Sequence, residues 1–148
     1  MRFAVAVLIV AAVVACTAKE EATPDSAAAA ASPAAPTVAS FAGTWNTAAV
    51  LEGAPDTVKS TLNIMADGTC SLVLADRPNI PCTTSISGDS LVVQTGEYES
   101  ILRKGVKTSV RTAAVMSGNM MTGHMVSSYV MPNGQQNVNG TFTSTKAP

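Results

Sequence analysis

The segment 110–125, VRTAAVMSGNMMTGHM, contains two runs of alternating side chains joined by Gly118-Asn119. Successive side chains of a strand point to opposite faces, and a two-residue turn pairs positions of opposite parity. The turn therefore sets Met116 opposite Met121. The segment predicts a β-hairpin with one mainly apolar face.

Three further turn signals extend this pattern along the chain: Ala66-Asp67-Gly68, Gly88-Asp89 and Asn133-Gly134. Each of them also sets apolar positions opposite one another, pairing Leu62 with Leu72, Ile86 with Leu91, and Tyr129 with Val138. The turns delimit eight predicted strands, near residues 41–51, 57–65, 69–75, 80–87, 90–96, 106–117, 120–131 and 136–145.

The apolar residues of these eight strands fall on one face. An antiparallel meander of such strands buries that face by folding into a sandwich or by closing into a barrel, and only closure removes the exposed edges. We therefore expect an all-β domain, an eight-stranded antiparallel up-and-down barrel over residues 41–148. Its inward face is predicted to consist of Trp45, Ala49, Val58, Leu62, Ile64, Leu72, Leu74, Ile80, Ile86, Leu91, Val93, Val106, Val110, Met116, Met121, Met125, Tyr129, Val138 and Phe142.

The first predicted strand contains Gly43-Thr44-Trp45. This tripeptide resembles the Gly-x-Trp that opens lipocalin-like, or calycin, barrels, in which the Trp closes one end. The resemblance implies a lipocalin-like barrel and a basic residue near the end of the last strands packed over the Trp. Lys146 is the residue of this chain that could occupy that place.

The N-terminal residues read as an export signal. An apolar run follows Arg2 and ends at Cys16, and it is shorter than the ~20 residues that a membrane-spanning helix needs. Val13-Val14-Ala15-Cys16 resembles the lipobox of bacterial lipoproteins, which implies removal of residues 1–15 as a signal peptide and a lipid on Cys16. By this resemblance we expect an exported protein whose lipid anchor holds it in the cell envelope, at the outer membrane and facing the periplasm.

Residues 16–40 join this anchor to the predicted barrel. They are rich in Ala, Pro, Ser and Thr, and Pro24, Pro33 and Pro36 interrupt any helix that the alanines would favour. No apolar face is present with which the segment could dock. We expect a disordered tether.

The balance of charge argues against a nucleic acid as partner. Lys and Arg total 9 and Asp and Glu total 10, so the positive field that phosphate binding requires is missing. Arg103, Lys104, Lys107 and Arg111 form a local basic cluster. We interpret this cluster as a solvated strand face and loop.

Two cysteines lie six residues to either side of Asp76, where opposite positions of a hairpin fall. In an exported protein this placement of Cys70 and Cys82 favours a disulfide between neighbouring strands. The spacing is not Cys-x-x-Cys, so we expect a structural rather than a redox role.

One connection, residues 96–105, is longer than the others. Glu99 and Arg103 are four residues apart, and a single helical turn there would cap one barrel mouth with Tyr98 and other apolar side chains turned inward. A plain loop or an extension of a strand fits the same residues. The two alternatives remain open at this point.

The sequence offers no catalytic or metal-binding signature. The single histidine, His124, has outward parity, whereas the nearby Met121 and Met125 have inward parity, so imidazole and thioether groups would not share a metal. No carboxylate falls on the inward parity of a strand, and no nucleophile elbow, phosphate loop or zinc motif occurs. We expect no enzymatic activity, no cofactor and no metal.

Small and hydroxylated residues interrupt the apolar inward face, which would leave a cavity with weak hydrogen-bonding capacity and no charge. We therefore expect a binder of a small, neutral, mostly apolar ligand, contacted by Trp45, Met121, Met125, Tyr129 and Phe142. The alternative is a protein-interaction or inhibitor module of the envelope, similar to membrane-anchored lysozyme inhibitors in size and export route. A ligand cavity would measure several hundred Å3, whereas an interaction module would have a filled core and an exposed patch.

Overall fold

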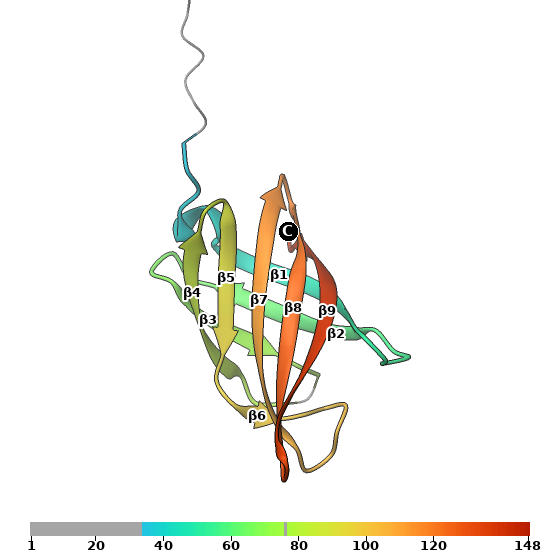
Figure 1. The fold of residues 1–148 in the computed structure, drawn as a ribbon. Coiled ribbons are helices and arrows are strands. Elements are labelled where there is room, and N and C mark those ends of the chain that lie inside the picture. Colours follow the sequence, from blue (N-terminus) through green and yellow to red (C-terminus); the bar gives the residue numbers. More distant parts are fainter. Residues whose placement is uncertain (1–33, 76) are drawn as a thin grey trace, which may run out of the picture. The chain divides into compact units, whose positions relative to one another are not determined.

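The structure, a computed structural model, describes residues 34–75 and 77–148 (Figure 1). The predicted signal peptide, Cys16 and most of the predicted tether lie outside these residues. Within the described part of the chain, no helix is both long enough and apolar enough to cross a membrane.

The described residues form an all-β barrel of antiparallel strands (Figure 1). Each strand except β5 pairs with the next along the chain, β9 pairs with β1, and β5 pairs with β7, which closes the sheet. The short β6 continues β5 along the same edge of β7, so the barrel has eight strand positions, as predicted. The elements are η1 (Val38–Phe41), β1 (Gly43–Leu51), β2 (Val58–Ile64), β3 (Thr69–Val73), β4 (Ile80–Ser87), β5 (Ser90–Thr95), β6 (Tyr98–Glu99), β7 (Lys107–Ser117), β8 (Met120–Met131) and β9 (Gly134–Lys146).

The strand register agrees with the sequence at three hairpins and differs at one. The pairs Met116 with Met121, Ile86 with Leu91 and Leu62 with Leu72 are all present. In the β8–β9 hairpin, however, the turn is Pro132-Asn133, so Tyr129 lies opposite Gln136 rather than Val138. Proline favours the first of the two central positions of a turn, and glycine favours the position directly after the second one, where Gly134 lies. The shift is two residues, which leaves every side chain on its predicted face.

One end of the barrel is closed around Trp45. Its indole Nε1 donates a 2.9 Å hydrogen bond to the carbonyl oxygen of Phe41, at the end of η1. The ammonium of Lys146 lies 5.4 Å from the centre of the Trp45 ring, so a basic residue does cover this Trp. Gly43 beneath it has a backbone φ of +135°, a conformation that favours glycine, and a Cβ there would also come within 2.7 Å of the flexible end of the Lys146 side chain. Val38 also packs on the core, so the packed structure begins before residue 41.

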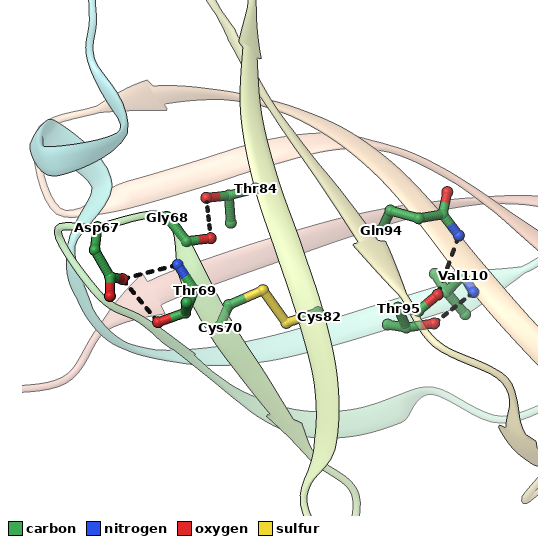
Figure 2. The surroundings of a disulfide bond; sticks show 9 residues. All are labelled: Asp67, Gly68, Thr69, Cys70, Cys82, Thr84, Gln94, Thr95 and Val110. Atoms are coloured by element: carbon green, nitrogen blue, oxygen red, sulfur yellow. Dashed lines mark hydrogen bonds between the residues drawn. A yellow bond between two sulfur atoms is a disulfide. The ribbon is translucent and has the colours of Figure 1, made fainter.

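The predicted disulfide is present between β3 and β4 (Figure 2). Cys70 and Cys82 are register partners with a Cα–Cα distance of 4.9 Å. At the start of β3, the Asp67 side chain accepts hydrogen bonds from the backbone nitrogen of Thr69 at 2.9 Å and from its hydroxyl at 2.7 Å. These hydrogen bonds fix the turn between β2 and β3, and the disulfide then ties β3 to β4.

Replacing Cys70 and Cys82 together with alanine is expected to lower the free energy of unfolding by about 2–3 kcal/mol. The bond closes a loop with a sequence separation of 12 residues, which restricts the unfolded chain. Urea unfolding followed by circular dichroism measures the loss. Reducing the disulfide of the wild type should cause the same loss of stability, and the same treatment should not affect the double variant. A urea midpoint of the wild type that stays unchanged after reduction would contradict the prediction.

Candidate functional site

Two small cavities lie inside the barrel, toward the end that carries β6. The inner one measures about 80 Å3 and the outer one about 40 Å3. A water molecule takes about 30 Å3 of liquid, and pockets for drug-sized ligands measure about 300–1,000 Å3. The barrel is thus mostly filled. The two cavities share the walls Val58, Leu74, Tyr98, Val110 and Met125.

The structure brings together three of the five predicted ligand residues. Met125 and Phe142 line the inner cavity, and Met125 and Tyr129 line the outer one. Trp45 and Met121 line neither, since they are buried in the core beside the closed end. The candidate site is therefore the β6 end of the barrel, away from Trp45.

Two buried hydroxyl groups face the outer cavity. Ser127 and Tyr129 are each only 3% exposed, and neither hydroxyl takes part in a hydrogen bond with another described residue. No fully enclosed side-chain oxygen or nitrogen of the described residues lacks a partner, so these two hydroxyls reach open space. By contrast, the buried Thr95 hydroxyl oxygen accepts a 2.8 Å hydrogen bond from the backbone nitrogen of Val110 (Figure 2). The cavity therefore offers free hydrogen-bonding groups within an apolar wall.

Tyr98 lines both cavities and stays protonated over a wide pH range. Burial, together with the neighbouring Tyr129 and against the lowering effect of Arg77, raises the pKa of its phenol to about 12. At neutral pH the phenol is thus a hydrogen-bond donor. Tyr98 comes from β6, where it pairs with Thr108.

Two guanidinium groups lie at the mouth of the barrel. Arg103 lies over the Tyr129 ring at 4.3 Å from its centre and donates a 2.6 Å hydrogen bond to the side-chain oxygen of Gln136. Arg77 donates a 2.6 Å hydrogen bond to the carbonyl oxygen of Glu99. Arg103 is partly buried by these contacts with β8 and β9, whereas the other members of the basic cluster, Lys104, Lys107 and Arg111, are exposed.

The connection between β6 and β7 forms the wall of the outer cavity without a helical turn. The Ser100 hydroxyl accepts hydrogen bonds from the backbone nitrogens of Leu102 at 3.1 Å and Arg103 at 3.0 Å. Ile101 and Leu102 line the cavity although they are 41% and 40% exposed. The Glu99 carboxylate accepts a 3.2 Å hydrogen bond from the Gly105 nitrogen rather than pairing with Arg103. The residues thus cap the mouth as an irregular loop.

The histidine and the methionines lie on opposite faces of β8, as predicted. His124 is exposed on the outer surface, while Met121 and Met125 are buried inside. Within the described ranges, no group of three or more His, Cys, Asp or Glu side chains could hold a metal ion.

Between about pH 10 and 12, we expect the free energy of unfolding to fall by on the order of 1–2 kcal/mol through Tyr98. The unfolded chain releases the phenolic proton near pH 10, whereas the raised pKa keeps it on the folded chain. This stabilising contribution is complete below pH 10 and is lost as the pH rises toward 12. Urea unfolding of the wild type and of Tyr98→Phe across this range should give a steeper decline for the wild type, and parallel curves would disprove the effect.

No family model matches the sequence, and no curated protein matches it. Among solved structures, the chain is similar to the crystal structure of a rhizavidin–biotin complex, with a TM-score of 0.43 and 14% sequence identity. The match covers 79% of this chain and 97% of the other. A similarity of this size says nothing about what the barrel binds.

Proposed function

We propose that this chain is a non-enzymatic lipoprotein of the cell envelope whose barrel binds a small, neutral, mostly apolar ligand. Its lipid on Cys16 holds it at the outer membrane, facing the periplasm. The proposal for the anchor rests on the sequence of the first sixteen residues. The proposal for binding rests on one observation: two adjoining, mostly apolar cavities, the outer of which is lined by Ser127 and Tyr129 with their unpaired hydroxyls.

The size of the cavities limits the ligand. An apolar cavity of about 150 Å3 is known to hold benzene, and the two cavities here measure about 80 and 40 Å3. A single ring or a short branched chain fits if the shared walls adjust slightly. Anything larger requires residues 100–105 to move aside. The ligand is therefore a molecule of few heavy atoms.

Binding of benzyl alcohol to the mature chain tests the proposal. The chain begins at residue 16 and carries Cys16→Ser to keep it without lipid. We expect the alcohol to shift the methyl resonance of Met125, which lines both cavities. Ser60→Leu fills the inner cavity from β2 and should abolish binding, whereas Thr61→Leu, on the outer face of the same strand, should not. An unperturbed Met125 at saturating alcohol would refute the proposal.

A second candidate function, an interaction or inhibitor module, is favoured by the mostly filled core. The outer face of β7, β8, β9 and β1 also has a shallow depression of about 590 Å3 around His124. Val50 and Val115 line it and are 50% and 49% exposed. Inhibition of a lysozyme by the mature chain, lost on Val50→Glu and Val115→Glu, would support this function. Inhibition that survives both substitutions would exclude this face.

A further inference from the structure

We infer that the ligand of the barrel carries a carboxylate, which Arg103 binds at the mouth while the apolar body of the ligand enters the cavities. This inference rests on the proposed function and names the class of ligand: a small monocarboxylate with one ring or a short branched chain. It keeps the proposed binding site and the apolar body of the ligand but replaces the neutral ligand with an anionic one, because the neutral charge was derived from the uncharged cavity walls and not from the mouth, where Arg103 lies.

The geometry of Arg103 leaves most of its hydrogen-bonding capacity available. Its guanidinium lies 4.3 Å from the centre of the Tyr129 ring and donates one hydrogen bond to Gln136. A guanidinium has five N–H donors, and an aromatic ring beneath it removes water from one face. Since the ring of Tyr129 also lines the outer cavity, Arg103 lies next to the place where a ligand would enter.

Arg103 has no carboxylate among its hydrogen-bond partners in the described residues. The acceptor on Gln136 is a neutral amide oxygen. The acidic residue best placed by sequence, Glu99, directs its carboxylate to the backbone nitrogen of Gly105 instead. Arginine pairs most strongly with a carboxylate, through two parallel hydrogen bonds. A carboxylate from outside the chain therefore has a vacant, preorganised partner.

The remaining polar groups at the mouth also favour an anion. Tyr98, Ser127 and Tyr129 contribute hydroxyls that can donate to a carboxylate oxygen, and both tyrosines line the outer cavity. Inward of these groups the wall is apolar, formed by side chains such as Leu74, Val110 and Met125. An amphiphilic molecule satisfies both regions, with its charge outward and its apolar part inward.

The experiment compares benzoate with benzyl alcohol, which share a ring and differ in charge, on the mature chain with Cys16→Ser at neutral pH. By calorimetric titration, we expect benzoate to bind at least about tenfold more tightly than the alcohol, because a hydrogen bond to a charged group is worth more than a neutral one. Arg103→Gln should lower the affinity for benzoate about tenfold and change the affinity for benzyl alcohol less than about twofold. Arg103→Lys keeps the positive charge but cannot make two parallel hydrogen bonds to a carboxylate, so it should cause an intermediate loss of affinity for benzoate.

Lys104→Gln is the matched control, because it removes the same charge from the exposed neighbour of Arg103. It should leave both affinities unchanged. Equal affinities for the two probes, or an equal loss of benzoate binding in Lys104→Gln, would overturn the carboxylate inference while the binding function stands. Failure of both probes to bind would overturn the proposed function and this inference together.

Discussion

Replacing Trp45 with alanine is expected to lower the free energy of unfolding by about 3–5 kcal/mol. The side chain is 0% exposed and belongs to the core at the closed end of the barrel, so its removal forfeits burial and leaves a cavity. The surroundings cannot easily collapse into this space, because η1 and Lys146 cover the ring from outside. Urea unfolding followed by circular dichroism measures the loss.

Two further substitutions separate the sources of this loss. Trp45→Phe keeps an aromatic ring but loses the hydrogen bond to the Phe41 carbonyl, and it should cost about 1–2 kcal/mol. Val50→Ala changes a half-exposed residue of the same strand and should stay within about 0.5 kcal/mol. If Trp45→Ala cost no more than Val50→Ala, Trp45 would not hold the closed end together.

The fold could be predicted from the sequence because two local signals, the turn residues and the alternation of apolar and polar side chains, agreed. Turn residues fixed the register of three hairpins, and alternation then placed apolar side chains such as Leu62 and Leu91 on one face. The last hairpin was misplaced because Asn133-Gly134 competes with Pro132-Asn133 for the turn, and only packing decides between them. Closure depends on the pairing of β1 with β9, whose residues are far apart in sequence. No local pattern encodes that contact.

Only part of the candidate site could be predicted from the sequence, because the parity of a residue gives the face of the strand on which it lies and not its height, that is, its position along the barrel axis. Met125, Tyr129 and Met121 share the inward face of β8, yet the first two line cavities and Met121 packs beside the closed end. Height follows from the tilt and stagger of strands around the barrel, which a single strand does not reveal. The same limit placed Trp45 in the predicted site.

The position of Arg103 at the mouth of the barrel could not be predicted, because loops lack periodicity. Glu99 and Arg103 have the spacing of a helical ion pair, but the Ser100 hydroxyl binds the next backbone nitrogens and turns the chain. Arg103 then contacts Tyr129 on β8 and Gln136 on β9, two strands that follow it in the sequence. No signal in the sequence links these residues. The part of the site that we infer to bind a carboxylate is thus tertiary in origin.

Gly123→Ala is expected to cost about 3 kcal/mol or more in the free energy of unfolding. A Cβ at this position would clash with the carbonyl oxygen of Ala113 and would lie 2.9 Å from the Cα of Ala114, both on β7. These are backbone atoms, so no rotamer change relieves the contact and the two strands must separate. Gly123 faces the small Ala114 in the register, as expected where a barrel strand bends and another backbone comes close.

Gly96→Ala distinguishes this steric effect from the general cost of replacing glycine. The nearest atom to its Cβ would be the Pro81 carbonyl oxygen at 3.8 Å, an ordinary contact. Alanine there restricts only the unfolded chain, so we expect no loss and a gain of up to about 1 kcal/mol. If Gly123→Ala unfolded at the same urea concentration as the wild type, β7 and β8 could not approach as closely as described. Because β8 carries Met125 and Tyr129, any separation that Gly123→Ala causes should also reach the ligand site.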